Sequence, residues 1–162
     1  MPKTYEPIAT STLGSPSSSV TFSSIPQTYT DLVLIYTGVV DSTSQYFQVQ
    51  LNGDTTTNYS YTVISYDGSA VTSFRQSSDG LLFGTTTSAT LQQGEIMHFM
   101  NYSNTSTYKT TLSRFSSTLY QVWTHVGMWR KTEAITSIKL YTTAGANFKA
   151  DATFTLYGIK AA

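Results

Sequence analysis

The chain has 162 residues with nine basic and nine acidic side chains, so its formal net charge is zero. A neutral chain lacks the cationic surface that binds nucleic acid, and a chain without cysteine has neither disulfides nor Cys-ligated zinc. No run of about 18 apolar residues is present, so the sequence predicts no membrane partner. The length is typical of one domain.

Proline marks the N-terminal segment, because all four prolines lie within the first 26 residues. Proline has no amide donor and is excluded from central strands. Residues 1–19 are therefore predicted to form an extended arm or an edge segment. An arm of this kind can dock on a neighbouring subunit, with Pro7 and Pro16 as candidate partner-binding residues. The single β-sandwich domain is then expected to span residues 20–162.

From residue 20 onward the sequence predicts strand after strand. In 46–51 apolar residues alternate with polar ones, which is typical of a strand with one buried face, whereas 31–36 is apolar throughout. Asn52-Gly53 is a tight-turn signal, because both residues tolerate a positive φ. The predicted strands are 20–22, 31–36, 46–51, 59–66, 80–84, 95–102, 108–115, 119–129, 134–142 and 148–159.

The fold class follows from this succession of strands. Helical periodicity is nearly absent, with a single turn hinted at only in 132–134. About eight to ten strands, separated by turns, favour an all-β fold. We predict a jelly-roll-like antiparallel β-sandwich, built from two four-stranded sheets, with an extended Pro-containing N-terminal arm.

The possible bases of a hydrolytic site are His98 and His125. A nucleophile needs such a base and a group that orients it, and no G-x-S-x-G turn occurs in the chain. Both histidines lie in predicted strands among large apolar residues. We interpret them as half-buried structural side chains, and we predict no catalytic residue, no cofactor and no enzyme activity.

Carboxylates offer two further kinds of site. Two of them could meet to cleave a glycosidic bond, but most flank a glycine or begin a strand, where aspartate commonly caps turns. Asn52, Asp54 and Asp79 could together bind calcium, although no EF-hand loop is present, and this alternative stays open. The acidic residues are Glu6, Asp31, Asp41, Asp54, Asp67, Asp79, Glu95, Glu133 and Asp151.

Aromatic residues make up 14% of the chain and could bind a glycan. Sugar rings stack on Trp and Tyr through their apolar C–H faces, while nearby polar groups bind the hydroxyls. The candidates are Trp123, Trp129 and Tyr120, together with Tyr59, Tyr61 and Tyr102. The alternative is that most of them are core residues or cross-strand pairs.

Four segments of the chain together match one recurring pattern. The first is Phe22-Ser23-Ser24-Ile25-Pro26-Gln27-Thr28-Tyr29-Thr30-Asp31-Leu32-Val33-Leu34, and the second is Leu51-Asn52-Gly53-Asp54 with Asn58-Tyr59-Ser60. The third is Trp129-Arg130 followed by Ile135-Thr136-Ser137-Ile138, and the last is Phe154-Thr155-Leu156-Tyr157-Gly158-Ile159. They resemble the opening, the central turn, the later strands and the closing strand of a module of tailed-bacteriophage virion proteins. The resemblance spans nearly the whole chain and carries no catalytic motif.

This resemblance implies a structural or adsorption protein of a virion. Our first hypothesis is a capsid decoration (cement) protein, typically a homotrimer, that binds the major capsid protein or other subunits of the assembled shell. The alternative is a tail-fibre or receptor-binding domain that grips host glycan through Trp123 or Trp129. A weaker third alternative is a glycan-cleaving enzyme that uses two of the carboxylates.

Overall fold

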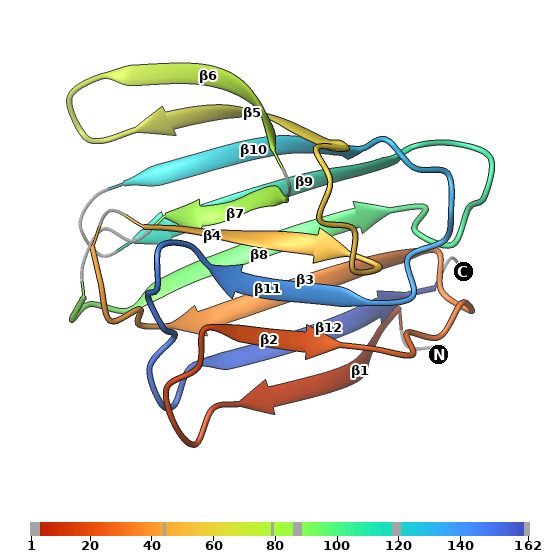
Figure 1. The fold of residues 1–162 in the computed structure, drawn as a ribbon, viewed down its shortest axis with the longest axis horizontal. Coiled ribbons are helices and arrows are strands. Elements are labelled where there is room, and N and C mark those ends of the chain that lie inside the picture. Colours follow the sequence, from red (N-terminus) through yellow and green to blue (C-terminus); the bar gives the residue numbers. More distant parts are fainter. Residues whose placement is uncertain (1–3, 44, 79, 86–88, 118–120, 161–162) are drawn as a thin grey trace.

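Two antiparallel sheets packed face to face make up the computed structural model, which describes residues 4–43, 45–78, 80–85, 89–117 and 121–160 (Figure 1). One sheet has eight strands and the other has four. The described residues contain no helix, and therefore no helix that is long and apolar enough to cross a membrane. The predicted all-β antiparallel sandwich is thus confirmed, with sheets of unequal size instead of two four-stranded ones.

The strands of each sheet run in an order that differs from the chain order. The eight-stranded sheet consists, from edge to edge, of β1 (Tyr5–Thr12), β12 (Thr153–Ile159), β3 (Asp31–Gly38), β8 (Gln93–Met100), β9 (Lys109–Ser117), β10 (Val122–Trp129), β5 (Tyr59–Tyr66) and β6 (Val71–Ser78). The four-stranded sheet consists of β2 (Ser19–Phe22), β11 (Ile138–Thr142), β4 (Tyr46–Leu51) and β7 (Leu81–Thr85).

Each of the ten predicted strands overlaps one of the twelve observed strands. The two additional strands, β1 and β6, are the edges of the eight-stranded sheet. Strand β6 has no fully buried residue, so its sequence lacks the apolar alternation that marks the other strands. Edge strands with little burial are therefore the ones that the sequence pattern misses.

Residues 5–12 are the edge strand β1, the second of the two interpretations of the N-terminal segment. The strand pairs with β12 and has a register shift between Pro7 and Ala9. The boundary predicted after residue 19 therefore does not separate this segment from the sandwich. Pro7 is exposed on the edge strand, where a missing amide donor is tolerated, and Pro16 is exposed between β1 and β2. Their role in binding a partner stays a prediction.

The turn at Asn52-Gly53 carries the chain from one sheet to the other. Both residues have a positive φ, 51° and 69°, and the amide of Asp54 donates to the carbonyl of Leu51 at 2.9 Å. This is the tight turn that the sequence predicts. It connects β4 of the small sheet to β5 of the large sheet instead of closing a hairpin.

An aromatic core joins the two sheets. Tyr36 on β3 stacks on Phe154 of β12, with ring centroids 5.0 Å apart, and meets Phe47 of β4 edge to face at 5.4 Å. Phe148 packs edge to face on Phe154 at 4.9 Å. All four side chains are fully buried. Contacts of this kind, added to the buried apolar area, hold the sheets in one arrangement.

Gly158 on β12 should not tolerate a side chain. An added Cβ would overlap the near end of the Tyr29 ring, whereas a Cβ added at Gly14 would have no atom within 4 Å. We expect Gly158→Ala to lower the free energy of unfolding by about 1–3 kcal/mol, as overpacking does. Gly14→Ala, the control, should change it little. Equal effects in denaturant titrations of the two variants would contradict this packing.

Candidate functional site

Trp129, predicted as an exposed binding residue, is fully buried in the structure. Its ring stacks on that of Tyr59 at 6.2 Å, and its Nε1 donates to Oδ2 of Asp54 at 2.8 Å. The alternating pattern of β10 places it on the inner face of the sheet, where it serves as a core residue. The prediction that Trp129 stacks on a sugar is therefore wrong.

The carboxylate of Asp54 is held by protein donors. Besides Trp129, the amide of Thr56 donates at 2.9 Å and Nδ2 of Asn58 donates at 2.9 Å. Burial opposes ionisation of the group, but these hydrogen bonds together bring its pKa below the usual range. Asp54 thus fixes the turn after β4 and anchors Trp129.

Asn52, another member of the possible calcium site, also has its side chain bound by protein groups. Oδ1 of Asn52 accepts from the amides of Thr136 and Ser137 at 2.8 and 3.1 Å, and its Nδ2 donates to the carbonyl of Ala134 at 2.8 Å. Asp79 lies outside the described residues. Among the residues that are described, no group of three acidic or histidine side chains has a metal-binding arrangement.

Asp31, Asp41 and Asp67 each accept a hydrogen bond from a backbone amide of a loop or turn. Oδ1 of Asp67 accepts from the amides of Ser69 and Ala70 at 2.9 and 3.0 Å, and these hydrogen bonds lower its pKa to about 2. Asp41 similarly accepts from the amide of Asn147 at 2.8 Å. These carboxylates stabilise loops and are not paired for acid–base chemistry.

A buried polar cluster lies at the inner face of β8, β9 and β10. Oγ of Ser113 lies 2.8 Å from Nδ1 of His125, and Oε1 of Glu95 lies 3.9 Å from the same nitrogen. Each of the three residues is 1% exposed. Burial lowers the pKa of His125 to about 4, and it raises the pKa of Glu95 well above its usual range, an effect that Ser113 only partly offsets.

This cluster does not have the geometry of a catalytic triad. A Ser–His–acid relay uses one ring nitrogen for the serine and the other for the carboxylate. Here Ser113 and Glu95 both approach Nδ1, while Nε2 of His125 and both carboxylate oxygens of Glu95 lack a hydrogen-bond partner in the described structure. His125 is therefore a structural residue, more deeply buried than predicted, and His98 is half-buried as predicted.

Trp123 belongs to a group of three aromatic side chains, here called the aromatic ledge: the exposed Phe74, the half-buried Trp123 and the buried Tyr61. They lie on the inner face of β5, β6 and β10. Phe74 meets Tyr61 edge to face at 6.4 Å and Trp123 at 6.2 Å. Phe74 is 37% exposed, and Trp123 is half-buried. The ledge lies at the side of the large sheet where β5 and β6 extend beyond β7 (Figure 1).

The remaining aromatic candidates do not offer exposed rings at this ledge. Tyr59 and Tyr102 are fully buried, and the hydroxyl of Tyr102 donates to the carbonyl of Pro26. Tyr120 lies outside the described residues. Of the predicted sugar-stacking residues, the structure thus brings Trp123 and Tyr61 together.

The outer face of the eight-stranded sheet exposes an apolar group that the sequence analysis did not single out. This group, here called the outer patch, consists of Ile64, Leu112, Val122 and Val126, which are 57%, 40%, 53% and 57% exposed. Leu112 and Val126 are direct cross-strand partners on β9 and β10. The signal was present in β10, where valines alternate with the inward-facing aromatic residues.

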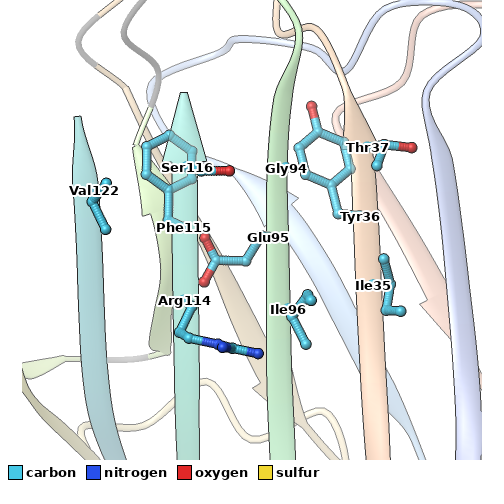
Figure 2. Close-up of a pocket in the computed structure, with 10 residues that line it drawn as sticks. All are labelled: Ile35, Tyr36, Thr37, Gly94, Glu95, Ile96, Arg114, Phe115, Ser116 and Val122. Carbon is cyan, nitrogen blue, oxygen red and sulfur yellow. The ribbon is translucent and has the colours of Figure 1, made fainter. Parts of the chain in front are cut away.

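A surface hollow of about 400 Å³ adjoins the outer patch (Figure 2). Ile35, Ile96, Arg114 and Val122 line it, and Arg114 extends toward β8 beside Ile96 (Figure 2). Gly94 lies opposite Thr37 on β3 and Ser116 on β9, and its missing side chain leaves room there. The hollow and the outer patch form one largely apolar surface, with Arg114 in the hollow and Arg75 of β6 beside Val126.

Comparisons with known proteins concern the architecture alone. No family model matches the chain, and no curated protein matches it. A galectin from Caenorhabditis elegans has 9% identity and a TM-score of 0.40, with 91% of this chain and 94% of that chain covered. A toad ovary galectin in complex with thio-digalactose has 11% identity and a TM-score of 0.36, with 86% of this chain and 98% of that chain covered. The PL-14 alginate lyase from Aplysia kurodai has 11% identity and a TM-score of 0.37, with 85% of this chain and 72% of that chain covered.

Replacing Glu95 by glutamine should change how stability depends on pH. Because the pKa of Glu95 is raised in the folded state, its contribution to the free energy of unfolding is fully present below the usual pKa of 4.5. That contribution is lost as pH rises toward the pKa of the folded state. His125, with its pKa lowered from 6.5 to about 4, acts in the opposite direction only below pH 6.5. As pH rises above 6.5, the free energy of unfolding should therefore fall in the wild type and stay level in Glu95→Gln.

The control for this experiment is Thr62→Gln, which introduces the same amide at an exposed position of β5 and removes no charge. Its pH profile in urea titrations should follow the wild type. A decline of equal slope in Glu95→Gln would show that Glu95 is not the group responsible.

Proposed function

We propose that the protein is a non-enzymatic structural subunit of a virus particle, of the decoration type, which binds the assembled shell and clamps neighbouring subunits. The four segments that resemble the tailed-phage virion module support this proposal. Low charge supports it as well: charged residues make up 11% of the chain, so little of the stability of such a subunit depends on ion pairs that salt screens.

The outer patch is the observation that carries the proposal. Soluble monomers rarely expose large contiguous apolar patches unless the patch binds something. Ile64, Val126 and Leu112 lie on three adjacent strands, and the hollow beside Arg114 continues this surface. A sheet face with apolar side chains on three adjacent strands suits an interface with other protein subunits.

The stabilising mechanism is mass action. A subunit that binds only the assembled lattice lowers the free energy of that lattice by RT ln(1 + [L]/Kd), where [L] is its free concentration. We expect the copies to associate as trimers on the shell, as the resemblance to this class implies. The site of action is then the virion.

The alternative, a tail-fibre or receptor-binding domain, differs in copy number. A decoration protein is present in hundreds of copies per particle, whereas a fibre domain is present in tens or fewer. Quantitative mass spectrometry of purified particles distinguishes the two, and the absence of the chain from particles would overturn both.

Val126→Asp tests the attachment surface directly. A buried, unpaired carboxylate in the interface should weaken binding to particles that lack the protein by at least about tenfold, because hot-spot substitutions typically cost more than 1.4 kcal/mol. Thr21→Asp places the same charge on the exposed side of β2 in the other sheet and serves as the control. Co-sedimentation measures binding, and thermal unfolding confirms that both variants fold. Unchanged binding of Val126→Asp would exclude the outer patch.

A further inference from the structure

The aromatic ledge has polar side chains arranged around its rings. Cross-strand pairing places Ser65 between Trp123 on β10 and Thr72 on β6. The hydroxyl groups of Ser65 and Thr72 lie 2.7 Å apart. At the other end of the ledge, the Tyr61 hydroxyl donates to Oε1 of Gln76 at 3.2 Å.

Side-chain alternation shows that this surface belongs to the inner face of the sandwich. On β10, Trp123 has the same parity as the buried His125 and Trp129. Phe74 is the cross-strand partner of Val63, which is fully buried. The ledge is therefore continuous with the core on one side, whereas Phe74 is exposed on β6, the edge strand of the large sheet.

The composition of the ledge matches one class of ligand. Aromatic rings bind the apolar C–H face of a pyranose, while hydroxyl and amide groups beside the rings bind its hydroxyls. Ser65, Thr72 and Gln76 provide such groups. Beyond the Ser65–Thr72 and Tyr61–Gln76 hydrogen bonds, a purely apolar partner would leave the remaining hydrogen-bonding capacity of these groups unused, which costs free energy when they are buried.

Charge decides between neutral and acidic sugars. Along the inner face of β5, β6 and β10, the described residues include no Lys, Arg, Asp or Glu. Arg75 on β6 pairs with Thr62 on the outer face, and His125 is uncharged near pH 7 because burial lowers its pKa to about 4. On the described inner face of these three strands, no cation is therefore in place to bind a uronate or a sulfated sugar.

We propose that the aromatic ledge is a binding site for a neutral saccharide, with Trp123 and Phe74 as the stacking residues and Ser65, Thr72 and Gln76 as hydrogen-bonding residues. The site lies on the opposite face of the large sheet from the outer patch. It therefore allows a subunit attached through the outer patch to hold a neutral polysaccharide at the same time.

The two tryptophans make a direct test possible by NMR. Trp129 is buried and its indole N–H donates a hydrogen bond to Asp54, so its N–H signal serves as an internal reference. The probes are neutral hexose oligomers (maltohexaose, cellohexaose, mannohexaose and a galactose hexamer) and, as the acidic comparison, a hexuronate hexamer. At millimolar concentrations at least one neutral oligomer should shift the Trp123 indole signal and leave that of Trp129 in place. The hexuronate should shift neither.

Variants tie the binding to the ledge. Phe74→Ala and Trp123→Ala should each weaken binding of the responding oligomer by about tenfold or more, equivalent to about 1.4 kcal/mol. Phe74 is the more exposed of the two, so Phe74→Ala provides a folded test should Trp123→Ala be unstable. Thr21→Asp, on the exposed side of β2 in the other sheet, should bind the oligomer as the wild type does.

Three outcomes would overturn the proposal. The first is the absence of any Trp123 shift with the whole neutral panel, and the second is an equal response to the hexuronate. The third combines two results: Phe74→Ala no longer attaches to particles, and the wild type binds none of the sugars. That combination would show that the ledge is a protein interface. Failure of attachment in Val126→Asp concerns the other face and leaves the saccharide site unaffected.

Discussion

The two sheets meet through side chains at every second position, and the burial that this contact provides stops where the narrower sheet ends. Four strands cannot cover the inner face of eight. Under the small sheet the inner positions hold fully buried aromatics such as Tyr36 and Phe154. Beyond β7 the same face holds half-exposed rings with hydroxyl and amide neighbours. The mismatch in width thus creates a surface of core-like composition that remains accessible.

The same inner face also has polar groups within the core. Glu95 and His125 are each 1% exposed, and their side chains lack the full set of hydrogen bonds that buried polar groups normally have. Burial favours the neutral form of both, so the interior avoids an unpaired charge. This polar cluster is buried, whereas the residues of the aromatic ledge and of the outer patch carry no charge.

Strand alternation and turn chemistry made most of the fold predictable. The Asn52-Gly53 turn and the end of β5 at Tyr66 followed directly from the sequence. Relative strand order did not, because pairings such as β3 with β8 depend on contacts between distant segments. The aromatic candidates were divided for the same reason. Trp123 and Trp129 have the same parity on one strand, and only the position of the four-stranded sheet decides that Trp129 is buried and Trp123 reaches the surface.

The two free edges of the large sheet differ in their capacity to add another strand. On β1, Pro7 removes one amide donor, and the bulge before Ala9 distorts the ladder. Strand β6 has eight residues and no proline. Growth of the sheet by edge-to-edge pairing is therefore open on one side only. Two copies that joined along β6 would leave their β1 strands as the outer edges of the combined large sheet, where Pro7 and the bulge oppose further pairing of that sheet.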